Sequence, residues 1–579
     1  MPQEVVLCLP AMRDPAAFDA AELHLEAARA LRIALPRVRE VRVQRISFDA
    51  RPKHMQWRVA AEVFTTDEPA PPPLRHARPA LTPPPPEALR VAVVGMGPAG
   101  MFAALVLARA GLQVTILERG KDVQARRRDV AALNHGEPAD PDSNYAFGEG
   151  GAGTYSDGKL YTRSVKRGPV REVLETLVAH GAPETILVSW RPHVGSNRLP
   201  KVITALRETL QQGGVEVRFG ARASVILCDA EGRACGLQLA DGTTIGAAAV
   251  ILATGHSALD AVRMAQAAGA AVEAKGFAMG VRVEHSQAWV DSRQYRGVRE
   301  QAALPPAFYE LAAQSGERGV YSFCMCPGGW IVPSQTDPAA LLVNGMSLAK
   351  RDSPFANSGV VVEILPEDWC GRRGGRWGWP DLLRRAARLC ADPLLQEVVQ
   401  PPGGGAPIPV AEGRLPEDPQ ADPLFGARIQ KALEIVAAAA GRGANRAPAQ
   451  RCDHFVAGRG ETAEPLPTSY LPGLTPVDFG ALLPQGLVRR LREGLQEFEK
   501  RMPGYAGPSG QLVGVETRTS SPLRLPRDDE TLESTTLSGL LPIGEGAGFA
   551  GGIVSAALDG RRAGLALAAR LGAITTEER

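Results

Sequence analysis

Cysteine is scarce in this sequence, and no two cysteines stand at the Cys-x-x-Cys spacing. Eight cysteines among 579 residues are too few for a disulfide-stabilised secreted scaffold. The chain also lacks an uninterrupted run of about 18 apolar residues, the length that a membrane-spanning helix needs. Its first residues lack the basic stretch and apolar core of a secretory signal. We therefore expect a cytoplasmic protein with reduced thiols and no membrane partner.

A strong charge imbalance is absent as well. The formal net charge is +2 and charged residues make up 22% of the chain, so the overall charge does not favour nucleic acid or a membrane surface as a partner. The apolar fraction of 44% is ordinary for a globular protein. A chain of this length is expected to fold into two or three domains.

Changes in composition predict where these domains begin and end. A strand–helix–strand–strand pattern is followed by a proline-rich linker, by alternating strands and helices, by an irregular stretch, and by a final Gly-rich segment. We expect an α/β fold: a single Rossmann-type domain with an inserted α+β substrate or cap domain. The expected ranges are 1–66 for a small βαββ module, 67–89 for the linker, 90–270 and 501–579 for the two parts of the Rossmann-type domain, and 271–500 for the insertion.

The N-terminal module is locally basic. Residues 29–58 hold nine Arg and Lys against two acidic residues, and Arg51-Pro52-Lys53 is predicted to form a turn. A solvated face is the ordinary interpretation of such a run, and a docking surface for an acidic partner or RNA is the alternative.

A dinucleotide-binding fingerprint begins after the linker. Val91–Val94 is an apolar run suited to a buried parallel strand, and it leads directly into Gly95-Met96-Gly97-Pro98-Ala99-Gly100. A predicted helix over 101–110 and a second strand over 114–117 follow, and Glu118 stands at the end of that strand. Strand, glycine turn, helix and terminal acid are all in register, which makes this signal much stronger than an isolated Gly-x-Gly-x-x-Gly.

Each residue of the fingerprint has a physical role. Gly95 permits the tight turn, Gly97 lets a diphosphate approach the backbone, and Gly100 lets the helix lie close to the strand. The free N–H groups of the first helical turn favour the diphosphate charge. We expect Glu118 to accept hydrogen bonds from the ribose hydroxyls of the adenosine.

The C-terminal segment favours FAD over NAD. A short strand over 540–543 precedes the turn Gly544-Glu545-Gly546-Ala547-Gly548, and a helix is predicted from Ile553 onward. Glu545 suits a ribityl hydroxyl, and the amides of Gly551, Gly552 and Ile553 suit the pyrimidine end of the flavin, where a helix N-terminus stabilises negative charge. An NAD domain needs no such closing element.

A third element lies between these two ends. The apolar strand over 247–253 ends in Ala253-Thr254-Gly255, a turn that in flavoproteins of this architecture returns the chain to the FAD domain. By the same analogy, the backbone near Ala223 is expected to meet the adenine edge. No second Gly-x-Gly-x-x-Gly opens a strand–helix–strand unit after residue 270, which excludes a two-dinucleotide-domain disulfide reductase.

Several long motifs resemble those of a bacterial family called FAD-dependent dehydrogenases. They are Phe147–Leu160, Ala253–Ser257, Phe323–Gly329, Glu516–Pro522 and Gly544–Gly552. The resemblance covers nearly the whole chain and implies FAD binding on a three-layer, glutathione-reductase-like fold; it implies no substrate. The candidate cofactor-binding residues are Gly95, Gly97, Ala99, Gly100, Glu118, Arg119, Gly150, Gly151, Ala152, Thr154, Ala223, Thr254, Gly255, Gly544, Glu545, Gly551, Gly552 and Ile553.

Two motifs offer candidates for proton or electron transfer. Lys159 in the Gly-rich loop is either a proton donor near flavin N5 or part of a purely structural loop. Cys324-Met325-Cys326 is either a redox pair or two buried strand cysteines, and strand alternation would point both thiols to one face. Among these, Cys326 is our candidate. We expect no metal, because no second Cys or His pair has matching spacing.

A polar run before the closing turn adds further candidates. Glu516 and Arg518 either contact an anionic substrate and the flavin ring or form a salt-bridged loop. His256 follows the Ala-Thr-Gly turn and is either a general base or a structural histidine. Arg126, Arg127 and Arg128 either touch a phosphate or lie on a solvated helix face, and the solvated face is the interpretation we favour.

These observations together predict an FAD-dependent oxidoreductase that transfers a hydride between flavin N5 and a small organic substrate, with NAD(P)H as a possible electron donor. An oxygen-using hydroxylase is the first alternative, although the Gly-Asp ribityl motif typical of that class is missing here. An RNA-binding flavoprotein, gripping tRNA with its basic N-terminal module, is the second.

Overall fold

The computed structural model describes residues 2–11, 18–49, 55–69, 76–161, 168–295, 304–401 and 404–573. The predicted turn at 51–53 and part of the proline-rich linker lie outside these ranges.

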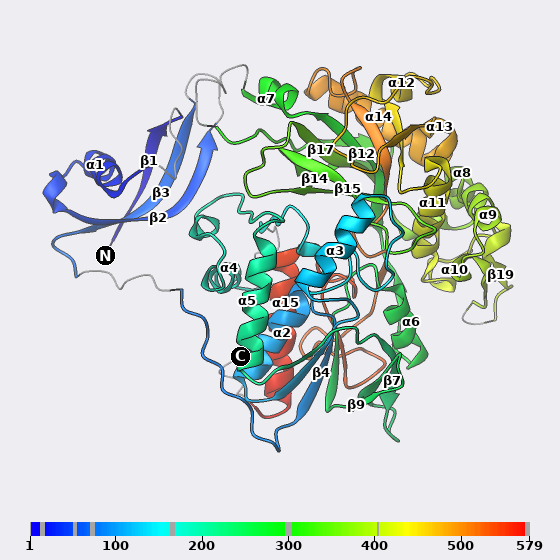
Figure 1. Cartoon of the computed structure of the whole chain (residues 1–579), viewed down its shortest axis with the longest axis horizontal. Helices are drawn as coiled ribbons and strands as arrows, with labels where there is room; N and C mark the ends of the chain where they lie inside the picture. The colour runs from blue at the N-terminus through cyan, green and yellow to red at the C-terminus, as the bar shows by residue number, and fades with distance from the viewer. Residues whose placement is uncertain are drawn as a thin grey trace.

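The N-terminal module is a three-stranded antiparallel sheet with one helix, as predicted. Its elements are β1 (Gln3–Pro10), α1 (Ala20–Leu31), β2 (Val38–Asp49) and β3 (Gln56–Thr65), and the strand order is β1-β3-β2. The module extends to one side of the molecule in Figure 1. It is nevertheless attached to the main body, because the Ile46 N–H donates to the Val188 carbonyl at 2.7 Å and the Trp190 N–H donates to the Ile46 carbonyl at 3.1 Å.

A five-stranded parallel sheet unites the two distant segments that carry the glycine motifs. Its strand order is β24-β10-β4-β5-β6, and every neighbouring pair is parallel. Only β10 therefore separates the C-terminal strand β24 from β4, the strand that opens the fingerprint. The strands are β4 (Arg90–Val94), β5 (Gln113–Leu117), β6 (Glu216–Arg218), β10 (Ala249–Leu252) and β24 (Leu540–Pro542).

Different layers cover the two faces of this sheet. Alternate side chains of β4 point to opposite faces, so that Val91 and Val93 join one apolar core and Ala92 and Val94 join another. The first core contains the helices α2 (Pro98–Arg109), α5 (Leu199–Gln212) and α15 (Ile553–Arg570), and the second contains the antiparallel strands β7 (Ala223–Cys228), β8 (Ala234–Leu239) and β9 (Thr244–Gly246). The other helices of this region are α3 (Val123–Asn134), α4 (Val170–Ala179) and α6 (Leu259–Ala267).

The first and last helices of this domain pack in direct backbone contact. A Cβ at Gly560 of α15 would overlap the Ala99 carbonyl oxygen of α2, and a Cβ at Gly564 would lie 2.9 Å from the Val106 Cβ. Figure 1 shows α15, in red, alongside α2 and α5. Small residues on α15 thus allow the end of the chain to lie on the fingerprint helix.

The second domain is built on a seven-stranded sheet of order β13-β14-β17-β12-β22-β20-β21. Its strands are β12 (Phe277–Ser286), β13 (Ala312–Ser315), β14 (Arg318–Cys326), β17 (Phe355–Ile364), β20 (Ala447–Arg451), β21 (Leu474–Pro476) and β22 (Gln511–Glu516). A hairpin of β15 (Gly329–Pro333) and β16 (Val343–Ser347) lies beside it. The longer helices of this domain are α7 (Gln287–Tyr295), α8 (Gly371–Trp377), α9 (Trp379–Leu389), α11 (Phe425–Gly441) and α14 (Gln485–Arg501).

The expected end of the insertion at residue 500 is wrong. Strand β22 pairs with β12 on one side and with β20 on the other, so it lies inside the seven-stranded sheet. The chain leaves this sheet only after Glu516. Composition did not indicate this boundary, because β22 is a buried apolar run that suits either sheet.

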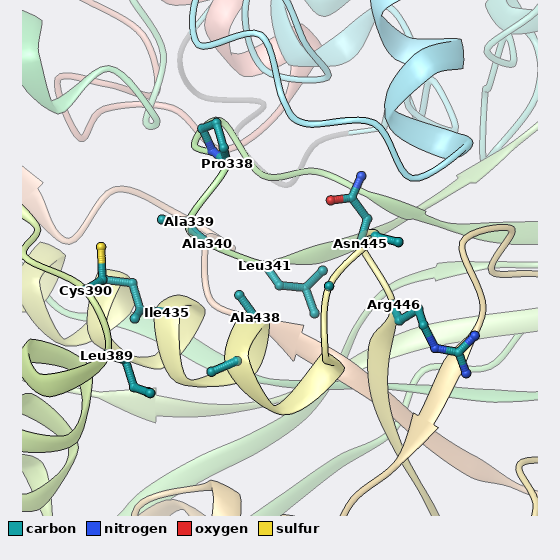
Figure 2. A pocket seen from close by; sticks show the side chains of 13 residues that line it. Pro338, Ala339, Ala340, Leu341, Leu389, Cys390, Ile435, Ala438, Asn445 and Arg446 are labelled. Carbon is teal, nitrogen blue, oxygen red and sulfur yellow. The ribbon is translucent and has the colours of Figure 1, made fainter.

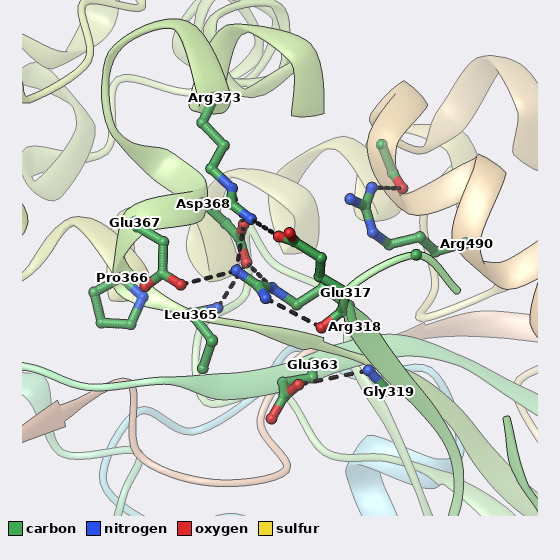
Figure 3. A network of polar contacts seen from close by, with 12 residues as sticks. Glu317, Arg318, Gly319, Glu363, Leu365, Pro366, Glu367, Asp368, Arg373 and Arg490 are labelled. Carbon is green, nitrogen blue, oxygen red and sulfur yellow. Dashed lines mark hydrogen bonds and ion pairs between the residues drawn. The ribbon is translucent and has the colours of Figure 1, made fainter. Parts of the chain in front are cut away.

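A buried ion-pair network stabilises the helical end of the second domain (Figure 3). Arg318 of β14 donates to both oxygens of Asp368, at 2.6 and 3.0 Å, and to Glu367 at 2.9 Å. Arg373 of α8 also contacts Asp368, at 3.0 Å. These bonds satisfy the Asp368 carboxylate, which is fully buried.

Among the residues that the structure describes, none of the helices has both the length and the apolar content that a bilayer crossing requires.

Candidate functional site

Two helix N-termini meet at a short glycine turn. A 3-10 turn over Gly151–Gly153 lies between the start of α2 and the start of α15. A Cβ at Gly151 would lie 3.2 Å from the Gly97 Cα, and a Cβ at Gly153 would lie 2.9 Å from Ile553 Cγ1. The three glycine motifs, far apart in the sequence, therefore line one continuous groove.

The Thr254-Gly255 turn closes this arrangement from the other side. A Cβ at Gly95 would lie 2.5 Å from the Ala253 carbonyl oxygen, and one at Gly546 would overlap the Gly255 carbonyl. A Cβ at Gly544 would lie 3.0 Å from the Ala99 Cβ, and Gly544 has a φ of +75°. The turn is thus wedged between the fingerprint and the C-terminal motif.

Open space and unpaired helix amides lie beside the glycines of the groove. A Cβ at Gly97 would come no nearer than 3.9 Å to any protein atom, and one at Gly551 or Gly552 would meet nothing within 4 Å. The helix N-caps Gly97 and Gly552 have no side-chain cap, so the amides of the first turns of α2 and α15 remain available. Open space beside uncapped amides is what a diphosphate and a flavin pyrimidine require.

Glu118 stands at the end of β5 and is 4% exposed. Its carboxylate accepts the backbone N–H groups of Met96 at 2.9 Å, Gly120 at 2.9 Å and Gly148 at 3.0 Å. A carboxylate offers about four acceptor sites. Glu118 uses three of them to hold three loops together, which leaves one acceptor site for a ribose hydroxyl. Its predicted role in ribose binding stays a prediction.

Arg119 and Ala223 lie near this end of the groove. The Arg119 guanidinium is 4.6 Å from the centre of the Phe147 ring and forms an ion pair with Asp260. Ala223 opens strand β7 and pairs with Leu239. Arg119 therefore has protein partners of its own, and contacts of both residues with adenosine stay predictions.

Two residues of the Gly-rich loop form hydrogen bonds that hold the loop in place. The Gly150 N–H donates to the Met96 carbonyl at 2.8 Å, and the buried Thr154 hydroxyl donates to the Glu149 carbonyl at 3.0 Å. The Thr154 hydroxyl therefore has a protein partner, and its expected contact with the cofactor stays a prediction. Gly151 and Ala152 occupy the exposed side of the loop.

A small cavity of about 50 Å³ adjoins the loop. It is formed where the Gly-rich loop, the Thr254-Gly255 turn and the seven-stranded sheet come together. Its lining includes Ala152, Ser156, His256, Asn344, Glu516 and Arg518. Three sequence candidates, His256, Glu516 and Arg518, thus face one space.

Glu516 forms a buried ion pair with Arg282 of β12. Arg282 Nη1 lies 3.0 Å from Oε1 and 2.9 Å from Oε2, and the two side chains are 0% and 3% exposed. Burial nevertheless raises the pKa of Glu516 to about 7, despite the opposing effect of Arg282. A carboxyl with this pKa exchanges a proton readily near neutral pH.

Arg518 is held by a carboxylate of the protein. It donates to Glu434 of α11 from Nε at 2.8 Å and from Nη2 at 2.6 Å, and to the Thr336 hydroxyl from Nη1 at 3.1 Å. Of the two alternatives for this run, the structure supports the salt-bridged loop. The bidentate face of Arg518 is therefore not free for an anionic substrate.

Lys159 reaches the two cysteines of β14. Its Nζ lies 3.4 Å from Cys324 Sγ and 3.6 Å from Cys326 Sγ, and 3.8 Å from Asp157 Oδ2. All eight cysteines are free thiols. Both sulfurs lie beside the same ammonium group, which agrees with the expectation that the two thiols share one face of the strand.

Regular strand alternation is not the reason for this placement. Cys324 has a φ of +46°, and the pairing of β14 with β17 shifts register between Phe323 and Cys326. The bulge therefore interrupts the regular alternation of side chains at Cys324.

A larger cavity of about 300 Å³ lies elsewhere, between α9, α11 and the loop over 443–446 (Figure 2). Its lining is mostly alanine and leucine, and it shares no residue with the glycine groove. Asn445, on its rim, donates to the Leu133 carbonyl of α3 at 3.0 Å. This loop therefore connects the second domain to the end of α3.

Known proteins match most of this chain. A family model described as "FAD-dependent protein, C-terminal domain-like" matches residues 276–375 and 410–519, and one described as "FAD binding domain" matches residues 88–131. An uncharacterized protein of Clostridium beijerinckii is 38% identical over 475 residues, which cover 81% of this chain and 79% of that protein. The chain belongs to the FAD-dependent protein family.

Solved structures resemble this FAD-dependent protein only weakly. CtdE in complex with FAD is 10% identical with a TM-score of 0.29, over 83% of this chain and 84% of that one. The 3-ketosteroid-Δ4-(5α)-dehydrogenase from Rhodococcus jostii RHA1 is 14% identical with a TM-score of 0.32, over 84% and 99%. FqzB is 16% identical with a TM-score of 0.26, over 50% of this chain and 56% of its own. No conclusion on substrate or reaction follows from similarities this weak.

One buried arginine was misplaced in the sequence analysis, and another was not singled out. Arg126 is fully buried and donates to the carbonyls of Asn144, Tyr145 and Glu149, so the expected solvated face is wrong at this position. Arg282 was not singled out. A charged residue inside the apolar run of β12 was the available signal, because a charge there requires a buried partner.

Proposed function

We propose that this protein is an FAD-dependent oxidoreductase that transfers a hydride between flavin N5 and an organic substrate, on the side of the flavin where Glu516 lies. The observation that carries the proposal is the meeting of the α2 and α15 N-termini at Gly151–Gly153. FAD supplies the hydride acceptor or donor when it is bound.

The chain's own residues bind the two ends of the cofactor in this proposal. The amides that begin α2 hold the diphosphate, and those that begin α15 stabilise negative charge at the flavin pyrimidine. Glu545 binds the ribityl chain. Lys275 and His256 lie near enough to Glu545 to lower its pKa, although burial has the larger effect and raises it.

Proton handling belongs to Glu516. It lines the cavity and has a pKa of about 7, and Arg282 fixes its orientation through two hydrogen bonds. A substrate that gains or loses a hydride must often exchange a proton as well. Because Glu434 neutralises Arg518, the cavity favours a neutral polar substrate over a strongly anionic one.

An anaerobic spectrum of the purified protein tests this function. We expect a yellow protein whose flavin band near neutral pH bleaches with an organic donor or with NADPH or NADH. Bleaching by a nicotinamide would make the protein a reductase, and bleaching by organic donors alone would make it a dehydrogenase. A protein that stays colourless with saturating FAD would overturn the proposal.

A further inference from the structure

A buried cluster of charge surrounds the two cysteines of β14. The Lys159 side chain is 16% exposed, and the sulfurs of Cys324 and Cys326 are its nearest partners at 3.4 and 3.6 Å. Asp157, 2% exposed, is farther away at 3.8 Å. A lysine ammonium that has left water needs an anion nearby, or its charge is costly.

The carboxylates of this cluster are already engaged with other cations. Asp157 pairs with Arg351 at 2.8 Å, a shorter contact than its contact with Lys159. Glu516 pairs with Arg282 at 2.9 Å. Among the described residues of this cluster, Lys159, Arg351 and Arg282 thus share two carboxylates. His193, which bridges to Lys159 through the backbone, adds no anion, and burial lowers its pKa to about 4.

A thiolate on β14 would balance the remaining positive charge. Cys324 is the better position for it, because Arg282 Nη2 donates to the Cys324 carbonyl at 3.0 Å and brings a second cation close. A hydrogen bond from Cys326 lowers the pKa of Cys324, and Lys159 and Arg282 lower it further. The Cys326 thiol donates to the Cys324 carbonyl at 3.3 Å. Its contact with Cys324 and its burial raise the pKa of Cys326, which keeps its proton.

The backbone and the surface suit a reactive first thiol. Cys324 is a non-glycine residue at a φ of +46°, a strained conformation of the kind that collects at functional sites. Cys324 is partly exposed whereas Cys326 is fully buried. Three exposed aromatic residues lie near Cys324. Tyr321 and Phe323 precede it on β14, and Tyr161 is close enough for Cys324 to affect its pKa.

We propose that Cys324 and Cys326 form a redox-active dithiol that reduces a disulfide substrate, with Cys324 as the attacking sulfur. The Cys324 thiolate forms a bond to one substrate sulfur, and the other substrate sulfur leaves as a thiolate and takes the proton of Cys326. Cys326 Sγ then attacks Cys324 Sγ and releases the second substrate sulfur, which takes a proton from water. The pair loses two electrons, and the substrate disulfide becomes two thiols.

Oxidised glutathione serves as the probe, with the full-length FAD-loaded protein carrying Cys8→Ser and Cys228→Ser to remove the exposed thiols. We expect a Cys324–Cys326 disulfide in the peptide map and two glutathione thiols released for each protein. A further Cys326→Ser change should trap one glutathionyl group on Cys324. A further Cys324→Ser change should abolish thiol release. An adduct on Cys326, or equal release from the Cys324→Ser protein, would overturn the proposal.

Lys159 has its own test in the rate of alkylation by iodoacetamide. At pH 6 we expect Cys324 to react about tenfold faster than Cys235, which is also partly exposed, because thiolates are the reactive species. Lys159→Met should remove this advantage and Lys159→Arg should restore most of it. Equal rates for the two cysteines in the unchanged protein would exclude a Cys324 thiolate. The flavin spectrum of each variant reports separately on the proposed cofactor site.

Discussion

Arg282 Nη1 lies 2.9 Å from Glu516 Oε2, inside the molecule and 234 positions away in the sequence. The pair joins β12 to the end of β22, at the point where the chain leaves the seven-stranded sheet for the FAD-binding domain. Arg282 also donates to Asn344 and to the Cys324 carbonyl. One guanidinium therefore connects the cavity beside Glu516 to the strand segment that carries Cys324 and Cys326.

Replacing Glu516 with Gln should change how stability depends on pH. The pKa of Glu516 rises from 4.5 to about 7 on folding, so the folded protein holds a proton that the unfolded chain loses above pH 4.5. The stability of the natural protein relative to Glu516→Gln should therefore fall as pH rises from 4.5 to 7, by about 3 kcal/mol. Urea denaturation of both proteins at pH 5 and pH 7.5 measures this difference, and parallel curves would refute it.

Gly97→Val should abolish FAD binding while leaving the fold intact. A Cβ there would lie 3.9 Å from the Gly151 Cα, and the φ of −80° suits any residue, so we expect the valine to clash mainly with a bound diphosphate. We expect a loss of affinity of about 100-fold or more, equal to about 3 kcal/mol. Fluorescence titration with FAD measures it. Gly246→Val, in β9 and with nothing within 4 Å, is the matched control and should stay yellow.

Gly560→Ala should destabilise the protein through the contact of α15 with α2. The added Cβ would overlap the Ala99 carbonyl, and we expect a cost of about 2 kcal/mol or more. Gly375→Ala, in helix α8 with open space around it, should instead stabilise by about 0.5 kcal/mol. Thermal unfolding of the two variants gives the comparison. An undisturbed Gly560→Ala protein would mean that the helices are farther apart than described.

Arg518→Met should cost more than the double change Arg518→Met with Glu434→Leu. The single change leaves the fully buried Glu434 carboxylate without its bidentate partner, at a cost of about 3 kcal/mol. Removing both charges avoids this cost, so the double variant should recover much of the stability. A double-mutant cycle in urea separates the two terms. If Arg518 instead served mainly to bind substrate, the single change would raise KM and leave stability unaltered.

Local patterns were enough to predict much of the fold. The βαββ module, the fingerprint strand and helix, and the C-terminal strand and helix all lie where periodicity and glycine spacing indicated. These features are readable because each is recognised from the pattern inside a strand or helix and in the turn beside it, not from the strands with which it pairs. The boundary near residue 501 failed for the opposite reason: strand β22 belongs to its sheet through partners that are 60 or more residues away.

By itself, the amino-acid sequence determined that the chain carries a dinucleotide fingerprint, a closing FAD motif and two cysteines one residue apart. Only the tertiary structure decided which side chains meet. It paired Arg282 with Glu516, paired Arg518 with Glu434, and brought Lys159 to Cys324. The physical reason is that a buried charge must find a partner in space, and the sequence distance to that partner is not constrained by any local pattern.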